Sequence, residues 1–230
     1  MGRSYLREDI RKHIFVLYKT DKPSASQIAR CFLLQFNFPC LAVYRFGHWS
    51  WLLLRRSRFL GAVPTLVYIV LDYLVRLLYH VEISRKTRIG PGLYLGHPST
   101  IFIGPTSIGR NCSMTHNVTI GWGLGAQAPG MPMIGDDVWI GPGSVITGDI
   151  AIGNGVAISA GSIVSRSIPD NCLVAGNPAR VIQSAYDNRA LLAYSLTPEV
   201  GPVELEVEPV ALQERVVRDP AAPVGQANGT

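Results

Sequence analysis

The sequence of 230 residues predicts a mainly β protein, a parallel β-helix preceded by an α-helical region. Aliphatic residues recur every six positions from about residue 83 to 168, and small or polar residues fill the positions between them. Residues 1–81 lack this pattern and are rich in long apolar runs. A period of six fits neither an α-helix nor an ordinary strand. It fits a β-helix, in which each hexapeptide forms one short strand and one turn.

Composition and charge limit the classes of partner. Hydrophobic residues make up 47% of the chain and charged residues 16%, so we expect much of the surface to be neutral or covered. The net charge of +5 favours anionic ligands, but the basic residues form no long cluster that would bind nucleic acid. No secretory signal opens the chain and its four cysteines form no CxxC pair, so we expect a reduced, cytoplasmic protein.

Residues 1–81 are expected to form a helical domain. The charged segment SYLREDIRKHIFVLYKT ends near Asp21. Ser24 or Ser26 is placed to cap a second helix, beginning near residue 27. Two long apolar stretches follow, FPCLAVYRFGHWSWLLLRR and VPTLVYIVLDYLVRLLYHV.

The second apolar stretch is nearly long enough to cross a bilayer. Asp72 and Arg76 lie four positions apart inside it, where the centre of a bilayer would penalise both charges and a helix surface would pair them. We therefore predict a buried or oligomer-forming helix. Peripheral contact with the inner face of the membrane is the alternative.

Residues 82–182 are the predicted β-helix domain. Three runs of residues spaced by six are expected to point into its shaft. They are Ile83, Ile89, Leu95 and Ile101; Phe102, Ile108, Met114 and Ile120; and Ile134, Ile140, Ile146, Ile152, Ile158 and Val164. Residues 183–230 are the predicted C-terminal extension. From about residue 199 its Pro-, Glu- and Ala-rich composition predicts a mobile tail.

The breaks between these runs predict the binding face, because insertions in a solenoid form loops that often bind ligands. One extra residue, beside His97, separates the first two runs. The second break is GWGLGAQAPGMPM, which is two residues too long for two hexapeptides. We therefore expect a site between the two breaks.

Two histidines and a carboxylate are expected at this site. One coil of three hexapeptides plus the extra residue is 19 positions, and His116 lies 19 positions after His97. The two should stack on neighbouring coils, about 4.8 Å apart in backbone. Glu82 lies roughly one coil below His97. The alternative for His97 is a polar turn residue that faces water.

The ordered motifs resemble the serine acetyltransferases, within the hexapeptide-repeat acyltransferases. The resemblance runs from about residue 23 to 182 and includes YRFGHWSW, VEISRKTRIGPGLYLGHPSTIFIGPTSIG, VTIG, VWIGPGSVI, AISAGSIV and AGNPARVI. It implies a left-handed β-helix, acetyl transfer from acetyl-CoA to a hydroxyl without a metal, and sites formed between subunits of a homotrimer or a dimer of trimers.

The resemblance also implies roles for individual residues. His97 falls on the catalytic base, and Glu82 stands where the family has the Asp that orients this base. A base with a pKa near neutrality suits removal of a hydroxyl proton. Residues expected to hold acetyl-CoA or the developing oxyanion are Gly121, Gly123, Gly141, Pro142, Ala160, Gly161, Arg166 and Arg180. Residues expected to contact the acceptor are Asp21, His116 and Trp122.

Three positions depart from the family pattern for serine recognition. Family members that act on serine have an acid just before the catalytic histidine and an Arg-His pair in the long loop. Here these positions hold Gly96, Gly130 and Met131. An amino acid's charged groups would find few partners, so a sugar of a surface polysaccharide or its precursor is the expected acceptor. L-Serine is the alternative.

Two other classes remain open. A metal enzyme on the same scaffold would need more ligands than His97 and His116, the histidines of the repeat region. A non-catalytic assembly protein would not need the pair formed by Glu82 and His97. We therefore expect an acyltransferase.

Overall fold

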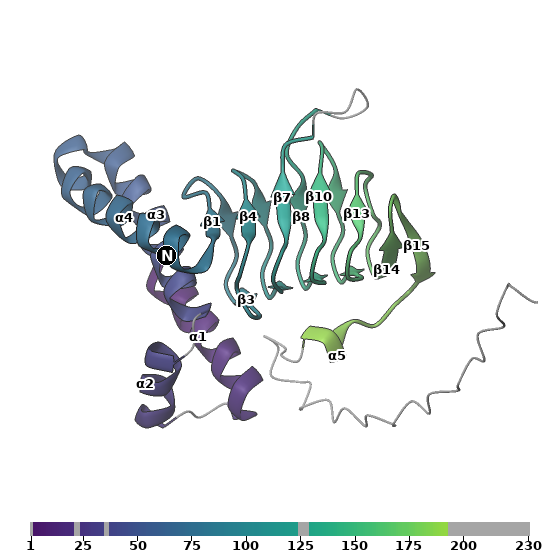
Figure 1. The fold of residues 1–230 in the computed structure, drawn as a ribbon, viewed down its shortest axis with the longest axis horizontal. Coiled ribbons are helices and arrows are strands. Elements are labelled where there is room, and N and C mark those ends of the chain that lie inside the picture. The colour runs from purple at the N-terminus through teal and green to yellow at the C-terminus, as the bar shows by residue number, and fades with distance from the viewer. Residues whose placement is uncertain (1, 21–23, 35–36, 124–128, 193–230) are drawn as a thin grey trace, which may run out of the picture.

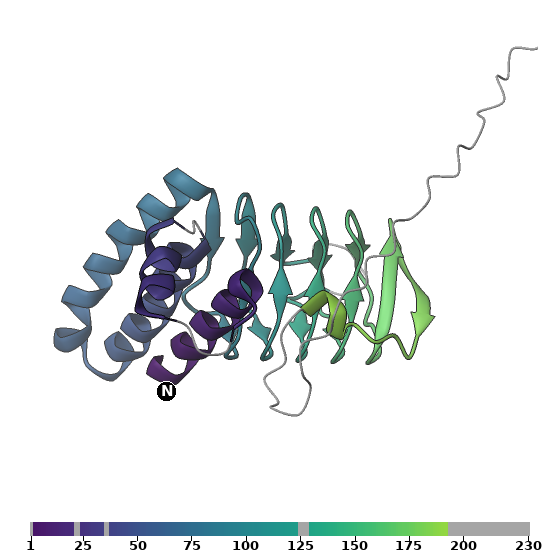
Figure 2. The same ribbon diagram turned by 90° about the horizontal axis from the view of Figure 1, so that it is seen from below.

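The structure is a computed structural model that describes residues 2–20, 24–34, 37–123 and 129–192. Four of the described helices gather at one end of a parallel β-helix, a short fifth helix lies beside the coils, and a β-hairpin closes the other end (Figures 1 and 2). The helices are α1 (Gly2–Tyr18), α2 (Ala25–Leu34), α3 (Asn37–Arg56), α4 (Arg58–Tyr79) and α5 (Arg189–Leu192).

Local capping explains where two of the helices begin. The backbone N–H of Gln27 donates to Ser24 Oγ at 3.3 Å, and the N–H of Ser24 donates to Gln27 Oε1 at 2.8 Å. This reciprocal pair makes Ser24, of the two predicted serines, the cap of α2. Ser57 caps α4 by accepting from the N–H of Leu60, and α4 ends at His80, which has left-handed backbone geometry.

The β-helix consists of three sheets, and successive strands pass from one sheet to the next. The first sheet contains β1 (Val81–Ile83), β4 (Ile101–Ile103), β7 (Thr119–Gly121), β10 (Val145–Thr147) and β13 (Ile163–Val164). The second contains β2 (Arg88–Ile89), β5 (Ser107–Ile108), β8 (Met133–Ile134) and β11 (Ala151–Ile152). The third contains β3 (Tyr94–Leu95), β6 (Ser113–Met114), β9 (Trp139–Ile140), β12 (Ala157–Ile158), β14 (Cys172–Gly176) and β15 (Ala179–Ser184). All of these strand pairs are parallel except β14 with β15.

The shaft is filled by the aliphatic residues that recur every six positions, with one correction. Phe102 was predicted to point inward, but its side chain is 44% exposed. Ile103 points inward instead and pairs with Ile120 of the next coil. Ile101, two positions earlier, is buried as predicted. Eight positions separate Leu95 from Ile103, the residue in register with Ile120, so the corner that holds His97 is larger than the single predicted extra residue requires.

The second break also differs from its prediction. Ile120 lies in β7 and Ile134 in β8, so the whole insertion occupies one corner between the first and second sheets. A backbone hydrogen bond of 3.0 Å from Gly123 N–H to Gly130 O closes the base of this loop. The insertion thus leaves the coil instead of replacing a hexapeptide. Residues 124–128 of the loop and the predicted tail, within 193–230, lie outside the described residues.

Helix α4 is not buried in the single chain, contrary to one part of the prediction. It is the one helix of the described chain that is long and apolar enough to cross a membrane, and 22% of its most apolar window is buried. The predicted pair does form, with Arg76 Nε 2.7 Å from Asp72 Oδ2. The exposed apolar surface leaves the oligomer and membrane alternatives open.

Candidate active site

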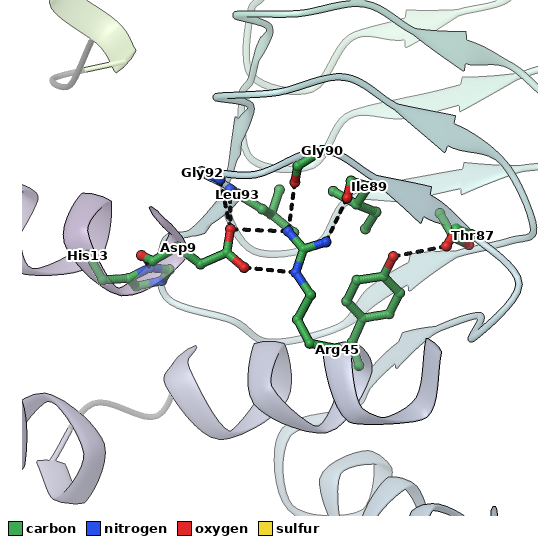
Figure 3. A network of polar contacts seen from close by, with 9 residues as sticks. Asp9, His13, Arg45, Thr87, Ile89, Gly90, Gly92 and Leu93 are labelled. Carbon is green, nitrogen blue, oxygen red and sulfur yellow. Dashed lines mark hydrogen bonds and ion pairs between the residues drawn. The ribbon is translucent and has the colours of Figure 1, made fainter. Parts of the chain in front are cut away.

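A buried ion pair fixes the first coil just before the strand that leads to His97. Arg45 of α3 donates from Nε to Asp9 Oδ2 at 2.8 Å and from Nη2 to Asp9 Oδ1 at 3.1 Å. Asp9 Oδ1 also accepts from the backbone N–H groups of Gly92 and Leu93, while Arg45 donates to the carbonyl of Ile89 (Figure 3). The pair thereby holds the turn that precedes β3.

Two further polar residues of α1 are fully buried against the β-helix. Lys12 Nζ donates to the carbonyls of Asn111 and Cys112 at 2.8 and 3.1 Å, and desolvation lowers its pKa to about 7. His13 donates from Nδ1 to the carbonyl of Asp9 at 2.8 Å, and burial lowers its pKa to about 4. Burial raises the pKa of Asp9, while Arg45 counteracts the shift. These residues were not singled out from the sequence, and their role is to dock α1.

His97 lies in the enlarged corner between β3 and β4. Its backbone is left-handed, with φ of 50°, and its side chain is exposed. The imidazole makes no hydrogen bond with any described residue, so it is free to meet a ligand. A shallow pocket of about 390 Å³ lies beside it. The pocket is lined by Leu78, Tyr79, His80, His97, Pro98 and Ser99.

His80 is a pocket residue that the sequence interpretation missed. It ends α4 with φ of 53°, and its carbonyl accepts from the N–H of Ile101 at 3.1 Å. It therefore occupies the coil below the His97 corner, although it belongs to the helical region by sequence pattern. The 17 positions between His80 and His97 are close to one coil, and this spacing is the signal that was available.

Glu82 does not contact His97 in this structure. Its Oε2 lies 2.9 Å from Nη1 of Arg76, and the two side chains are 41% and 43% exposed. In the backbone, Glu82 of β1 is paired with Phe102 of β4, the strand that follows the His97 corner. The predicted direct orientation of His97 by Glu82 is therefore absent here, because Arg76 holds the carboxylate. This arginine was expected only as a partner of Asp72.

The predicted stacking of the two histidine corners is borne out in the backbone register. Leu95 pairs with Met114, and Asn117 N–H donates to the carbonyl of Ser99 at 2.8 Å. Equivalent backbone hydrogen bonds join the following coils, from Gly143 N–H to His116 O and from Gly161 N–H to Pro142 O. We call the corners at residues 97–99, 116–117, 142–143 and 160–161 the histidine edge. His116 is exposed on this edge but does not line the pocket.

The histidine edge includes three predicted acetyl-CoA residues, Pro142, Ala160 and Gly161. A fourth, Gly141, directly precedes the edge. A Cβ on Gly141 would lie 2.7 Å from the backbone N of Ala160, so this glycine is required by coil packing alone. Gly161 has φ of 69° and open space around it, which leaves the backbone accessible to a ligand.

Five other predicted ligand residues lie away from this edge. Gly121 and Gly123 are buried at the start of the long loop, and Trp122 between them is 59% exposed. Arg166 follows β13 and Arg180 lies in β15; both are exposed and form no ion pair with a described residue. They remain available to anions. Asp21 lies outside the described residues.

The three positions that depart from the family pattern have local packing reasons. A Cβ on Gly96 would lie 3.2 Å from the Tyr94 ring, and one on Gly130 would lie 2.6 Å from Cβ of Asp149. Met131 packs where a side chain on Gly104 would be. A charged side chain at Gly96 or Gly130 would therefore require its neighbours to move.

The arrangement suits transfer of a group between two ligands that meet at His97. One ligand would follow the histidine edge, and the other would occupy the pocket. Within the described ranges, no group of three or more His, Cys, Asp or Glu side chains could hold a metal ion. The chemistry offered by the described side chains is that of a general base, which histidine supplies near neutral pH.

Known proteins with similar sequence and structure share this architecture. Residues 131–166 match the bacterial transferase hexapeptide family of six repeats. Chloroplastic serine acetyltransferase 1 of Arabidopsis thaliana is 37% identical over 173 residues, 74% of this chain and 52% of that protein. The chain spans about half the length of the first curated relatives it matches.

Two crystal structures extend the comparison. Serine acetyltransferase of Brucella abortus strain S19, in complex with coenzyme A, is 30% identical with a TM-score of 0.64, and the match covers 79% of this chain and 68% of that one. Serine acetyltransferase of Neisseria gonorrhoeae, in complex with serine, is 27% identical with a TM-score of 0.63, over 79% and 69% of the two chains. The predicted left-handed β-helix of hexapeptide repeats is confirmed.

Proposed function

Because the chain belongs to the serine acetyltransferase-like family of hexapeptide-repeat acyltransferases, we propose that it transfers the acetyl group of acetyl-CoA to the hydroxyl of L-serine. The observation that carries this proposal is the histidine edge. It aligns His97 with Pro142 and Gly161 through backbone hydrogen bonds between successive coils. Relatives of this fold that bind coenzyme A and serine support the choice of both substrates.

In the proposed reaction, His97 is the general base. Its imidazole removes the proton from the acceptor hydroxyl as the oxygen attacks the thioester carbonyl. The carbon–sulfur bond then breaks, and the proton passes from His97 to the departing thiolate of CoA. The exposed imidazole, without a hydrogen-bond partner among the described residues, suits this exchange of protons with two substrates.

Glu82 is a positioning residue in this proposal. A carboxylate beside a catalytic imidazole fixes its tautomer and stabilises its protonated form. To reach His97, the Glu82 carboxylate would have to leave its ion pair with Arg76. Both side chains of this ion pair are more than 40% exposed. Exposed ion pairs contribute little free energy, so this exchange is inexpensive.

Coenzyme A would lie along the histidine edge, where Ala160 and Gly161 leave the backbone open. Arg166 and Arg180 would meet its phosphates as charge-assisted hydrogen bonds. The site of a single chain is open to solvent, and a homotrimer or a dimer of trimers would cover it. We place the reaction in the cytoplasm.

A sugar hydroxyl is the second candidate acceptor. The observation that favours it is the pocket beside His97, whose six lining residues include no carboxylate and no arginine or lysine. The zwitterion of serine would find few charged partners there. An unpaired charge in a closed site is costly, whereas a sugar needs only hydrogen bonds.

An acceptor screen tests the proposal. Purified protein is incubated with acetyl-CoA and either L-serine or a panel of sugars and sugar nucleotides, and free thiol and the acetylated product are measured. Saturable formation of O-acetylserine is the expected result. Acetylation of sugars with serine inert would transfer the proposal to the second candidate. No acetyl transfer to any acceptor would favour a non-catalytic assembly protein.

A further inference from the structure

The outer face of α4 is a continuous apolar surface that no element of the described chain covers. We define this face by residues spaced three or four apart, on the side of α4 opposite α3. They are Phe59, Val63, Leu66, Val70, Tyr73 and Leu77. Their exposed fractions range from 54% to 94%. The stripe is about 27 Å long at 1.5 Å per residue, far more apolar surface than isolated exposed side chains provide.

The tip of the α3–α4 hairpin is strongly basic. Arg55 and Arg56 end α3, and Arg58 begins α4; all three are exposed and none forms an ion pair with a described residue. The sequence contains no Asp or Glu from residue 22 to 71. The first carboxylate of α4, Asp72, is already paired with Arg76. The hairpin therefore presents positive charge beside its apolar face.

Aromatic residues accompany the arginines at the tip. Trp49 is 47% exposed and Phe59 is 94% exposed, while the Arg55 guanidinium lies 5.2 Å from the centre of the Trp51 ring. The hairpin extends away from the β-helix, so this tip is remote from the coils (Figure 1). Apolar, aromatic and basic groups on one hairpin are the kinds of group that meet the acyl chains, interface and headgroups of a membrane surface.

We propose that the α3–α4 hairpin docks on a membrane that contains anionic phospholipids. The outer face of α4 lies among the upper acyl chains, and Arg55, Arg56 and Arg58 contact lipid phosphates. A second copy of the chain fits these charges less well, because its own hairpin offers no unpaired carboxylate to the three arginines. The proposal is independent of the acceptor and of catalysis, since it uses no residue of the pocket or the histidine edge.

Vesicle flotation of the full chain tests the docking. The probes are vesicles of phosphatidylcholine alone and vesicles in which phosphatidylglycerol replaces about one third of it. We expect binding to the anionic vesicles that weakens as salt is raised. The triple variant Arg55→Gln/Arg56→Gln/Arg58→Gln should bind roughly tenfold more weakly or worse, since each basic group near an anionic surface contributes. The triple variant Val63→Ser/Leu66→Ser/Val70→Ser should also lose binding.

A matched control removes three positive charges elsewhere. Arg88→Gln/Arg110→Gln/Arg189→Gln should bind within about twofold of the unsubstituted protein, because these exposed residues lie on the β-helix and α5. A tryptophan placed on the outer face by Phe59→Trp reads insertion of that face through quenching by acyl-brominated lipids, and Phe59 is 94% exposed, so this change should leave folding intact. Absence of both flotation and quenching contradicts the proposal. The proposal is also overturned if the unsubstituted protein is an oligomer that binds no vesicles and Val63→Ser/Leu66→Ser/Val70→Ser converts that oligomer to monomers.

Discussion

Two groups of charged side chains join the helical region to the first coil, and they differ in how much water reaches them. In the first, Asp9 and Arg45 are 0% and 8% exposed, and backbone groups of the coil complete their hydrogen bonds. In the second, Arg76 bridges Asp72 and Glu82 with side chains that are 15% to 43% exposed. The buried group is a fixed structural contact, whereas the exposed group lies next to the His97 coil and can change partners at little cost.

The largest expected effect comes from breaking the buried group. Asp9→Asn leaves the Arg45 guanidinium buried beside a neutral partner, so the free energy of unfolding should fall by about 3–5 kcal/mol. Chemical denaturation of the purified variant measures this. Asp72→Asn is the matched control, because it removes a carboxylate from the exposed group. A change below about 1 kcal/mol for Asp9→Asn would contradict the assignment.

His13, which is buried next to this group, should also make stability depend on pH. Burial lowers the pKa of His13 to about 4 from its ordinary value near 6.5, so the unfolded chain binds the proton first as pH falls. His13 therefore lowers the free energy of unfolding by roughly 3 kcal/mol as the pH falls from about 6.5 to 4.

Comparison with His13→Asn isolates this contribution from those of Lys12 and Asp9, whose pKa values burial also shifts. Unfolding curves for the two proteins should converge as the pH falls toward 4. Parallel curves across this range would show that His13 is not the buried neutral base described above.

A smaller effect is expected from Glu82→Gln, which sharpens the role of the exposed group. Acetyl transfer should slow by about tenfold, because His97 loses the carboxylate that positions it in the proposed reaction. The affinity for CoA should be unchanged, since Glu82 lies outside the histidine edge. Asp72→Asn should change neither quantity, although it shares Arg76. Equal rates of acetyl transfer in Glu82→Gln and Asp72→Asn would show that Glu82 has no role in the mechanism.

The smallest effect is expected from Arg76→Gln. The exposed ion pairs of Arg76 should contribute less than about 1 kcal/mol to stability, in contrast to Arg45. Thermal unfolding of the two arginine variants side by side measures the difference. A loss for Arg76→Gln as large as that for Arg45→Gln would mean that exposure does not separate the two groups.

The sequence predicted the β-helix well because its physical signal is repeated many times. The residues that recur every six positions from Ile134 to Val164 are all buried, so the predicted register holds over successive coils. The choice between Phe102 and Ile103 failed because three apolar residues stand in a row, and either phase is consistent with the next coil. The long loop was counted as hexapeptides because length alone does not show where the chain leaves the shaft.

The candidate site was predicted only where it follows the repeat. The stacking of His97 and His116 follows from counting residues per coil. The contacts of Glu82 with Arg76, of Asp9 with Arg45, and of His80 with the pocket depend on how α1, α3 and α4 are oriented. Hydrophobic periodicity reports which face of a helix is apolar, but not which coil that helix meets.

The role of His97 is tested most directly by the rate of acetyl-CoA consumption in His97→Ala, with His116→Ala as the matched control on the next coil. We expect His97→Ala to lower kcat by roughly 100-fold or more while CoA binding and the free energy of unfolding stay unchanged, and His116→Ala to have a smaller effect. Turnover of His97→Ala equal to that of the unsubstituted protein would contradict the role of His97 as the general base.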